Sequence, residues 1–502
     1  MSMKHLTRSS MLYSVGGIAM RAVGFLMIPV YTRFLTPEDY GILELIELVT
    51  VISSITFGLM AIGGAMTRIY FEREDPEWRK RVVSSAIFGA AAMSAALAVV
   101  GILFSSAIAG WLFDDAGRAH FIQATFASLF TGLLVEVSLI YLRIRDEPGR
   151  FIIISVTQLI LTLLLNILLI VGLRWGVWGF LVSKMVVTSI GCVYMLTHVL
   201  RRVGVGWSGE AVRKMIAFGT PLILNGLSVF VVHFSDRFFI KEYVTLAQLG
   251  IYGLAYKFGF LISDLVGAPF QRAWAARFYE FAEKPGWEKR FMDVLLWLAF
   301  AVMVAWTGLA IFVDELFRIM TTPSFQVAAL FVPAIAMGYV ARTLGEFLGD
   351  LLYIKKQSMR RAKIMTASAV VNLALNAALI PAYGVWGAAW ATLLTWTFFL
   401  LVAGVLARRT YPIPVPFGPL ALLFGLSCGG YALSRAVVID VAAIRWMLKA
   451  AILAAVIAGT YLLGYFRGEQ RAVFEEGFGR ILRALRLRLG MTGGAGEGPR
   501  PD

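Results

Sequence analysis

Long apolar runs separated by short polar clusters recur along the whole chain. Each run holds about 20 residues, which is enough to cross the hydrocarbon core of a bilayer as an α-helix. The clusters between them are rich in Arg, Lys, Gly and Pro and leave no room for a soluble domain. The pattern predicts fourteen membrane-spanning helices, at 10–33, 41–66, 82–105, 119–142, 151–172, 177–200, 215–239, 249–270, 291–313, 324–348, 362–381, 385–407, 418–438 and 445–466.

The loops between these helices alternate between basic and nearly uncharged. One set contains clusters such as 79–81 and 355–356, whereas the other set contains isolated residues such as Arg33 and Arg118. Cytoplasmic loops carry an excess of Lys and Arg, so the basic set is assigned to the cytoplasm. Lys4 and the basic tail after residue 466 place both termini on that side, which requires an even number of spans.

The composition is typical of a membrane protein with many spans, and it argues against several kinds of partner and site. Charged residues make up 15% of the 502 residues, and the net charge of +15 follows from the basic loops and tail. A nucleic-acid partner is not supported, because the charges are spread over many short loops without a binding module. Cys192 and Cys428 exclude a disulfide framework, and the four histidines lie on separate segments, so no metal site, cofactor or catalytic centre is expected.

Four stretches of sequence recur about half a chain apart. GVWG begins at Gly176 and again at Gly384, an offset of 208 residues. TPEDYGI (36–42) matches TLAQLGI (245–251) at an offset of 209, and LLLNILLI (163–170) matches LALNAALI (373–380) at 210. YLRIR (141–145) corresponds to YIKKQ (353–357) at 212. A steady offset over four stretches indicates an internal repeat.

The repeat predicts an architecture. The offset equals six spans, so both copies cross the membrane in the same direction, as in transporters built from parallel repeats. We expect an all-α integral membrane protein of two six-helix bundles around a central cavity, V-shaped, with an accessory C-terminal pair. The predicted domains are 1–206, 207–410, the accessory helices 411–466 and a basic cytoplasmic tail 467–502. The glycines of GVWG are expected to form the tight turn between two spans.

Ionisable residues inside the predicted spans are the candidate functional groups. They are costly in a membrane and face a partner or a water-filled cavity. Two interpretations stay open: interhelical ion pairs that hold the bundles together, or groups that handle a substrate or ion. Asp236 and Arg237 lie near the end of their span, so simple interfacial exposure is an alternative for them. The candidates are Arg21, Glu44, Glu47, Glu136, Lys184, Asp236, Arg237, Lys257, Asp264, Arg342 and Glu346.

For two of the cations, we favour a role with a substrate or ion over a structural ion pair. Arg21 and Lys257 lie within their spans, where an intramembrane cation is a functional candidate by default. Arg342 and Glu346 are four residues apart and could pair on one helix. Cations that line a cavity suggest an anionic substrate, and nearby carboxylates could carry protons or hold sodium to couple transport to an ion gradient.

The sequence resembles the polysaccharide-exporter and O-antigen flippases of the multidrug/oligosaccharidyl-lipid/polysaccharide (MOP) exporter superfamily. The element TR-x-L-x-x-x-x-YG falls at Thr32, Arg33, Leu35, Tyr40 and Gly41. FSDRFFI (234–240) and LGIYGLAYK (249–257) resemble the start of the second half in the same proteins. The resemblance covers the first twelve spans.

The resemblance implies a flippase rather than an enzyme. Such a protein moves a polyprenyl-diphosphate-linked oligosaccharide across the cell (inner) membrane for surface polysaccharide, O-antigen or lipopolysaccharide synthesis, beside polymerase and assembly proteins. We expect H⁺ or Na⁺ coupling without a bound cofactor. The candidate substrate contacts are Arg21, Arg33, Lys184, Arg237, Lys257 and Arg342, and the candidate coupling or gating residues are Glu44, Glu47, Asp236, Asp264 and Glu346.

Three alternatives remain from the sequence. A peptidoglycan lipid II flippase of the same superfamily also has an extra helix pair, which there helps to form a groove for the lipid tail. The last two predicted spans of this chain could do the same, or they could fill the bundle surface or make a dimer contact. A multidrug antiporter would be expected to have an acidic cavity, which the cations here oppose. A non-transporting scaffold or biosynthetic enzyme of the glycan pathway would explain neither the repeat nor the intramembrane charges.

Overall fold

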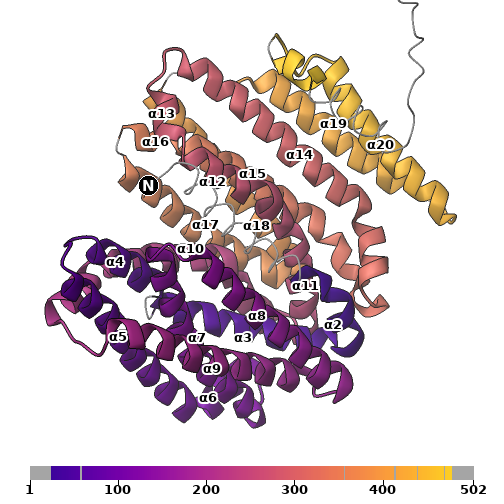
Figure 1. The fold of residues 1–502 in the computed structure, drawn as a ribbon. Coiled ribbons are helices and arrows are strands. Elements are labelled where there is room, and N and C mark those ends of the chain that lie inside the picture. The colour runs from indigo at the N-terminus through magenta and orange to yellow at the C-terminus, as the bar shows by residue number, and fades with distance from the viewer. Residues whose placement is uncertain are drawn as a thin grey trace, which may run out of the picture. The chain divides into compact units, whose positions relative to one another are not determined.

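The protein is helical throughout the part that the computed structural model describes, residues 24–56, 59–355, 357–411, 414–437, 439–468 and 470–476 (Figure 1). Contacts between helices divide the chain into two compact units. Unit 1 comprises residues 1–261 and 313–406, and unit 2 comprises 262–312 and 407–502. Since these units are defined by contacts and the predicted domains by the sequence repeat, the domain limits stay a prediction.

The first half of the chain forms eight α-helices within its described residues. They are α2 (Ile28–Phe34), α3 (Pro37–Thr56), α4 (Leu59–Tyr70), α5 (Pro76–Leu103), α6 (Ser105–Phe113), α7 (Ala119–Ile144), α8 (Pro148–Asn166) and α9 (Gly176–Val203). A single-turn 3₁₀ helix (Ala116–Arg118) precedes α7, and a π-helical turn (Ile167–Gly172) extends α8.

The second half forms nine α-helices within its described residues before the last pair. Its α-helices are α10 (Gly209–Tyr243), α11 (Leu246–Ile262), α12 (Ala268–Ala275), α13 (Phe278–Ala282), α14 (Trp287–Met320), α15 (Val332–Gly349), α16 (Leu351–Ile354), α17 (Ser358–Tyr383) and α18 (Val385–Thr410). A π-helical turn (Ser263–Gly267) joins α11 to α12, and a 3₁₀ segment (Pro323–Leu330) precedes α15. The helices α19 (Phe417–Ala436) and α20 (Ala442–Leu462) follow.

Ten helices in the described residues are long and apolar enough to cross a membrane, or eleven if the bent pair Pro323–Leu330 and Val332–Ile354 is one span. The prediction of an all-α integral membrane fold is confirmed. The count of fourteen stays a prediction, because it includes a first span that lies mostly outside the described residues.

The repeated heptapeptides form equivalent helix starts. The Thr36 backbone N–H donates to Asp39 Oδ2 (2.8 Å), and the Asp39 N–H donates to Thr36 Oγ1 (3.2 Å), which is a reciprocal cap for α3. At the start of α11, the Gln248 N–H donates to Thr245 Oγ1 (3.2 Å). Each repeat therefore opens its helix with a threonine that satisfies a free backbone donor.

The two equivalent helices cross each other at their glycines. A Cβ on Gly41 would collide with the backbone oxygen of Leu246, and a Cβ on Gly250 would collide with the backbone oxygen of Pro37. Gly41 and Gly250 occupy the same position of the repeat, as do Pro37 and Leu246. The contact is therefore symmetric, and it brings two backbones closer than any residue with a side chain allows. We call this crossing of α3 and α11 the seam.

The GVWG turns are equivalent as well. Gly176 and Gly384 have φ angles of +57° and +56°, in the left-handed region that glycine enters without strain. Three residues later, a Cβ on Gly179 would press on the backbone of Leu169, and a Cβ on Gly387 would press on the backbone of Leu379. Both leucines hold the same place in the LLLNILLI and LALNAALI repeats, so the expected tight turn between spans is confirmed in both halves.

Side-chain amides tie the corresponding helices together. In the first half, Asn166 Nδ2 of α8 donates to Tyr31 Oη of α2 (2.7 Å). In the second half, Asn376 Nδ2 of α17 donates to Ser235 Oγ of α10 (3.0 Å). Both asparagines come from the same repeat position, and each joins the fifth helical span of its half to the first.

Within unit 1, α10 connects the two halves. It packs against α3, α4 and α5 as well as against α17. Exposed ion pairs fasten both ends of α10 to loops of the first half, through Lys214–Glu72 (2.5 Å) at its start and Lys241–Asp114 (2.9 Å) at its end. Such exposed pairs add little stability each, so the apolar packing along α10 carries most of the contact.

In unit 2, the chain after α20 returns to α14. Tyr465 Oη donates to the backbone oxygen of Leu296 (2.7 Å), and Gln470 donates to Asp293 (2.6 Å). The ring of Phe466 lies 4.5 Å from that of Trp297. This packing places the start of the predicted tail against a helix of the same unit.

The turn glycines give a stability test. Gly387→Ala adds a Cβ that must displace the backbone of Leu379, so we expect a lower midpoint of thermal unfolding in detergent. Gly429→Ala in α19 is the matched control, because nothing lies near its added Cβ and Ala favours a helix interior by about 1 kcal/mol over Gly. Equal midpoints for the two variants would contradict the close approach at Gly387.

Candidate functional site

A cluster of charged residues lies directly beside the seam. Glu44 of α3 is buried, with 6% of its surface exposed. Its Oε1 lies 3.3 Å from Lys257 Nζ of α11, and its Oε2 lies 3.6 Å from Arg237 Nε of α10. One carboxylate of the first half thus meets two cations of the second half.

Glycine makes room for this carboxylate. A Cβ on Gly253 would collide with the carboxyl group of Glu44. Gly253 is also the position of the second repeat that corresponds to Glu44, so the pseudo-symmetric partner of the acid is a residue without a side chain. The seam is symmetric in its backbone and asymmetric in its charge.

Arg237 has several partners on its own helix. Its Nη1 donates to Asp236 Oδ1 (2.7 Å) and to the backbone oxygen of His233 (2.6 Å). The guanidinium lies 4.1 Å from the centre of the Tyr256 ring. The other oxygen of Asp236 accepts a hydrogen bond from Tyr252 Oη (2.5 Å). With Glu44 and Lys257, this makes a group of two acids and two cations that balances in charge, and all but the half-exposed Lys257 are buried.

Two cations of this cluster differ in how fully the protein surrounds them. Arg237 Nε is buried and has no hydrogen-bond partner, since 3.6 Å to Glu44 is too long for one. Lys257 is 49% exposed on its side chain, whereas Arg237 is only 3% exposed. Arg237 therefore depends on the protein for its charge balance, and Lys257 can reach other anions.

A second polar group continues into the second half. His233 Nδ1 lies 3.1 Å from the hydroxyls of both Tyr256 and Tyr339, and Tyr339 Oη donates to Tyr256 Oη (2.5 Å). Two residues further along α10, Ser235 Oγ donates to Asn372 Oδ1 (2.9 Å). The same oxygen accepts a hydrogen bond from Asn376 Nδ2 (3.1 Å). These bonds satisfy polar atoms that would otherwise be stranded among apolar helices.

The first half contains a polar cavity of about 480 Å³. Helices α3, α7, α8 and α9 each supply polar residues to its lining, at spacings that keep them on one face of the helix. They are Thr50 and Ser54 on α3, Ser128, Glu136 and Arg143 on α7, Ser155, Gln158 and Thr162 on α8, and Lys184 and Thr188 on α9.

The charges in this cavity differ from those at the seam. Lys184 and Glu136 have no ion-pair or hydrogen-bond partner for their side-chain charges in the described part of the chain. Glu47 is exposed on α3, one turn before Thr50, and is close enough for its charge to act on Lys184. Arg143 stacks on Phe151 with 4.8 Å from its guanidinium to the ring centre. Hydroxyls, an amide and unpaired charges of both signs thus face one space.

The candidate residues fall into several places. Glu44, Asp236, Arg237 and Lys257 come together at the seam, and Asp236 and Arg237 are 2% and 3% exposed, so interfacial exposure is wrong for them. Glu44 forms ion pairs with residues of two other helices, Arg237 and Lys257, as the interpretation of interhelical ion pairs expects. Lys184 lines the cavity, with Glu47 beside it.

The other candidates lie elsewhere. Arg342 and Glu346 pair with each other on α15 at 2.9 Å, and Arg33 is exposed near the end of α2. Asp264 lies in the π-helical turn after α11 and belongs to unit 2. Arg21 lies outside the described residues.

The sequence analysis missed part of the site. Tyr252 donates to Asp236, and the Tyr256 ring lies against Arg237. A spacing of four residues puts both tyrosine rings on one face of a helix, and the sequence does contain this signal. His233 was treated as one of four scattered histidines, because only the fold brings Tyr339 to it. Glu136 was recognised as intramembrane but not placed in a site, since its cavity needs four helices to form.

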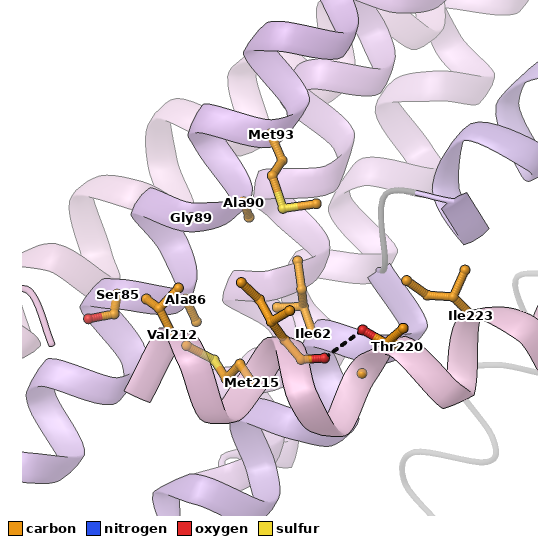
Figure 2. Close-up of a pocket in the computed structure, with 12 residues that line it drawn as sticks. Ile62, Ser85, Ala86, Gly89, Ala90, Met93, Val212, Met215, Thr220 and Ile223 are labelled. Carbon is orange, nitrogen blue, oxygen red and sulfur yellow. Dashed lines mark hydrogen bonds between the residues drawn. The ribbon is translucent and has the colours of Figure 1, made fainter. Parts of the chain in front are cut away.

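An apolar pocket between α4, α5 and α10 lies apart from these charges (Figure 2). Its volume is about 140 Å³. Its two hydroxyls are already used: Thr220 donates to the backbone oxygen of Ile216 (2.8 Å), drawn as a dashed line, and Ser85 accepts from the Ser208 N–H (2.8 Å). The pocket suits apolar groups and offers nothing to a charged headgroup.

A family model matches more than half of the chain. Residues 30–330 match the family described as polysaccharide biosynthesis protein. The chain belongs to this family. None of the curated proteins compared with the chain matches it.

Solved structures share the fold of this family member. A lipid II flippase MurJ in an inward closed conformation aligns with a TM-score of 0.74 at 14% identity, covering 90% of this chain and 99% of that one. An inward-facing multidrug resistance MATE family transporter of the MOP superfamily gives 0.62 at 16% identity, covering 79% and 98%. An outward-facing one gives 0.52 at 14% identity, covering 82% and 96%. At 14–16% identity these likenesses show a shared fold. The family match confirms the resemblance to polysaccharide biosynthesis proteins that the sequence motifs indicate.

The buried charges of this family member give a second test. Arg237→Leu leaves Glu44 and Asp236 without their main cation, and breaking a buried pair costs about 3–5 kcal/mol. Lys257→Met removes a half-exposed cation from the same carboxylate, which costs roughly 1 kcal/mol or less after solvent screening. We expect Arg237→Leu to lose monodisperse protein and thermal stability in detergent, and Lys257→Met to keep both. An Arg237→Leu protein as stable as the parent would rule out the charge balance described for the seam.

Proposed function

We propose that the protein is a flippase that moves a polyprenyl-diphosphate-linked oligosaccharide from the cytoplasmic to the outer leaflet by alternating access. In this proposal it resides in the cytoplasmic membrane, with both termini in the cytoplasm, and serves surface polysaccharide or O-antigen synthesis beside polymerase and assembly proteins. Family membership and the shared MOP fold support the transport of a lipid-linked glycan as a class.

The polar cavity of the first half is the observation that carries the proposal. A sugar headgroup cannot cross hydrocarbon without replacement for its hydrogen bonds to water. The cavity supplies hydroxyls and the Gln158 amide to a saccharide, and Lys184 supplies a cation without a partner. Unpaired charges at this depth are costly and are expected to serve a ligand.

The cations separate into two roles in this mechanism. Lys184 and Lys257 are the proposed substrate contacts, because one faces the cavity and the other is half exposed beside Glu44. A diphosphate bound by Lys257 would draw it from Glu44 and weaken one of the two attractions across the seam. Arg237 is held too deeply to meet a headgroup while the seam is closed, so we assign it to the seam.

We propose Glu44 as the residue that links an ion gradient to the seam. Protonation would remove its charge and with it the attraction to both Arg237 and Lys257 at once. The buried Arg237 would then lack a counter-ion from α3, which favours separation of α3 from α10 and α11. Asp236 stays bound to Arg237 and Tyr252 in either case, and Glu47 and Glu136 remain free to act on the cavity.

A lipid II flippase is the second candidate. The structural likeness to MurJ covers 90% of this chain and 99% of that one. The two candidates share the polyprenyl-diphosphate carrier and differ in the glycan. The hydroxyl-rich cavity with charges of both signs gives no preference for an organic cation, which is what a multidrug antiporter would need.

Flipping in proteoliposomes tests the proposal. A fluorescent polyprenyl-diphosphate oligosaccharide is followed by its accessibility to an added enzyme on one face, with and without a pH or sodium gradient. Lys184→Ala removes a charged hydrogen bond of about 1.5–3 kcal/mol, so we expect flipping to slow by about 10-fold to 100-fold, with partial recovery in Lys184→Arg. Lys284→Ala, which removes a cation from an exposed pair with Glu280, is the control and should flip at the parent rate.

The outcomes separate the candidates. Faster flipping of lipid II than of other polyprenyl-linked glycans would favour the second candidate. Full activity in Lys184→Ala would remove the cavity from the mechanism. Absence of flipping of any diphosphate lipid, together with efflux of a cationic dye, would refute the flippase assignment.

A further inference from the structure

An open space of about 780 Å³ lies along the last turns of α9 and is lined by side chains of this helix alone; we call this helix face the groove. The side chains that come first along this face are apolar and exposed: Ile190 is 54% exposed and Val193 is 70% exposed. Tyr194, His198 and Arg201 follow on the same face at spacings of three or four residues. From Ile190 to Arg201, twelve residues and about 16 Å of helix, the lining thus changes from apolar to aromatic to cationic.

At the cationic end, the positive charges outnumber the carboxylates that pair with them. Arg202 and Arg150 both bind Glu147, at 2.7 and 2.6 Å. Burial favours a neutral Glu147, but the hydrogen bonds and charges of Arg202 and Arg150 outweigh it and hold its pKa below the usual value. Glu147 is therefore charged and engaged, whereas Arg201 is exposed with no partner in the described part of the chain.

A histidine at the same place also lacks a partner. His198 Nε2 is buried without a hydrogen bond, and its ring stacks on that of Tyr194 with 6.1 Å between centres. An oxyanion between His198 and Arg201 would satisfy both groups, since a buried ring nitrogen without a partner is costly.

We propose that this groove binds an anionic phospholipid of the adjacent leaflet, with its phosphate at Arg201 and His198 and an acyl chain along Val193 and Ile190. The order of apolar, aromatic and cationic groups matches the order of chain, glycerol and phosphate in such a lipid. The Lys/Arg pattern of the loops places this end of α9 at the cytoplasmic leaflet, where anionic lipids attract basic residues. A second copy of the chain fits less well, because a symmetric contact here would face Arg201 with Arg201.

Lipid binding to the purified, delipidated protein in detergent tests the assignment, with native mass spectrometry as the readout. Phosphatidylglycerol and phosphatidylcholine of identical chains are compared. We expect phosphatidylglycerol to bind more tightly, and loss of the Arg201 cation to weaken its binding about fivefold, from ~1 kcal/mol per basic group. His198→Gln with Arg201→Gln should abolish the preference.

Two further variants make the result specific. Arg409→Gln removes an exposed arginine from the corresponding end of α18 and should leave binding unchanged. Val193→Trp fills the exposed apolar part without touching the charges and should weaken phosphatidylglycerol, while free glycerol phosphate should not displace the lipid.

Four results would overturn the proposal. These are equal affinity for the two lipids, an equal loss in Arg409→Gln, displacement by free glycerol phosphate, and delipidation that yields dimers which Val193→Trp prevents. The assay needs no flipping activity, so its outcome is independent of the proposed function.

Discussion

The backbone contact of α3 with α11 at Gly41 and Gly250 is the constraint on which the site depends. A Cβ at either glycine would collide with backbone of the other helix, so the two helices meet this closely only because both positions lack a side chain. The contact places Glu44 against Gly253 and within reach of Arg237 and Lys257. A single buried carboxylate thereby becomes the main electrostatic connection between the two halves in unit 1.

The charges of the seam and those of the cavity follow different physical rules. At the seam, two acids and two cations balance and are shielded by Tyr252 and Tyr256. Removing one partner there leaves a buried charge, so the cluster acts as a unit. In the cavity, Lys184 and Glu136 face space without partners. The proposed flippase would need both arrangements: a contact that holds until its charge changes, and charges that are free for a ligand.

Much of the fold follows from sequence repeats, because they fix backbone geometry. The offsets of about 208–210 residues identified pairs that prove equivalent in the structure, such as Gly176 with Gly384 and Asn166 with Asn376. Less of the candidate site can be predicted from the sequence. Hydropathy places Asp236 and Arg237 near a span end, but it cannot show that Glu44 of α3 and the tyrosines of α11 lie against them, so it does not predict their burial. The pairing of Arg342 with Glu346 was anticipated because it is local to one helix, whereas that of Glu44 with Lys257 needs the crossing of two helices.

The central claim is that α3 and α11 must part for the substrate to cross. Cysteines at Glu38 and Gln248, in the first turns of the two helices, can be joined with a short reducible cross-linker after replacement of Cys192 and Cys428. Flipping of a fluorescent polyprenyl-diphosphate oligosaccharide is then measured before cross-linking, after it and after reduction. The account predicts that flipping stops in the cross-linked protein and returns on reduction. Flipping at an unchanged rate with the two helices joined would contradict it.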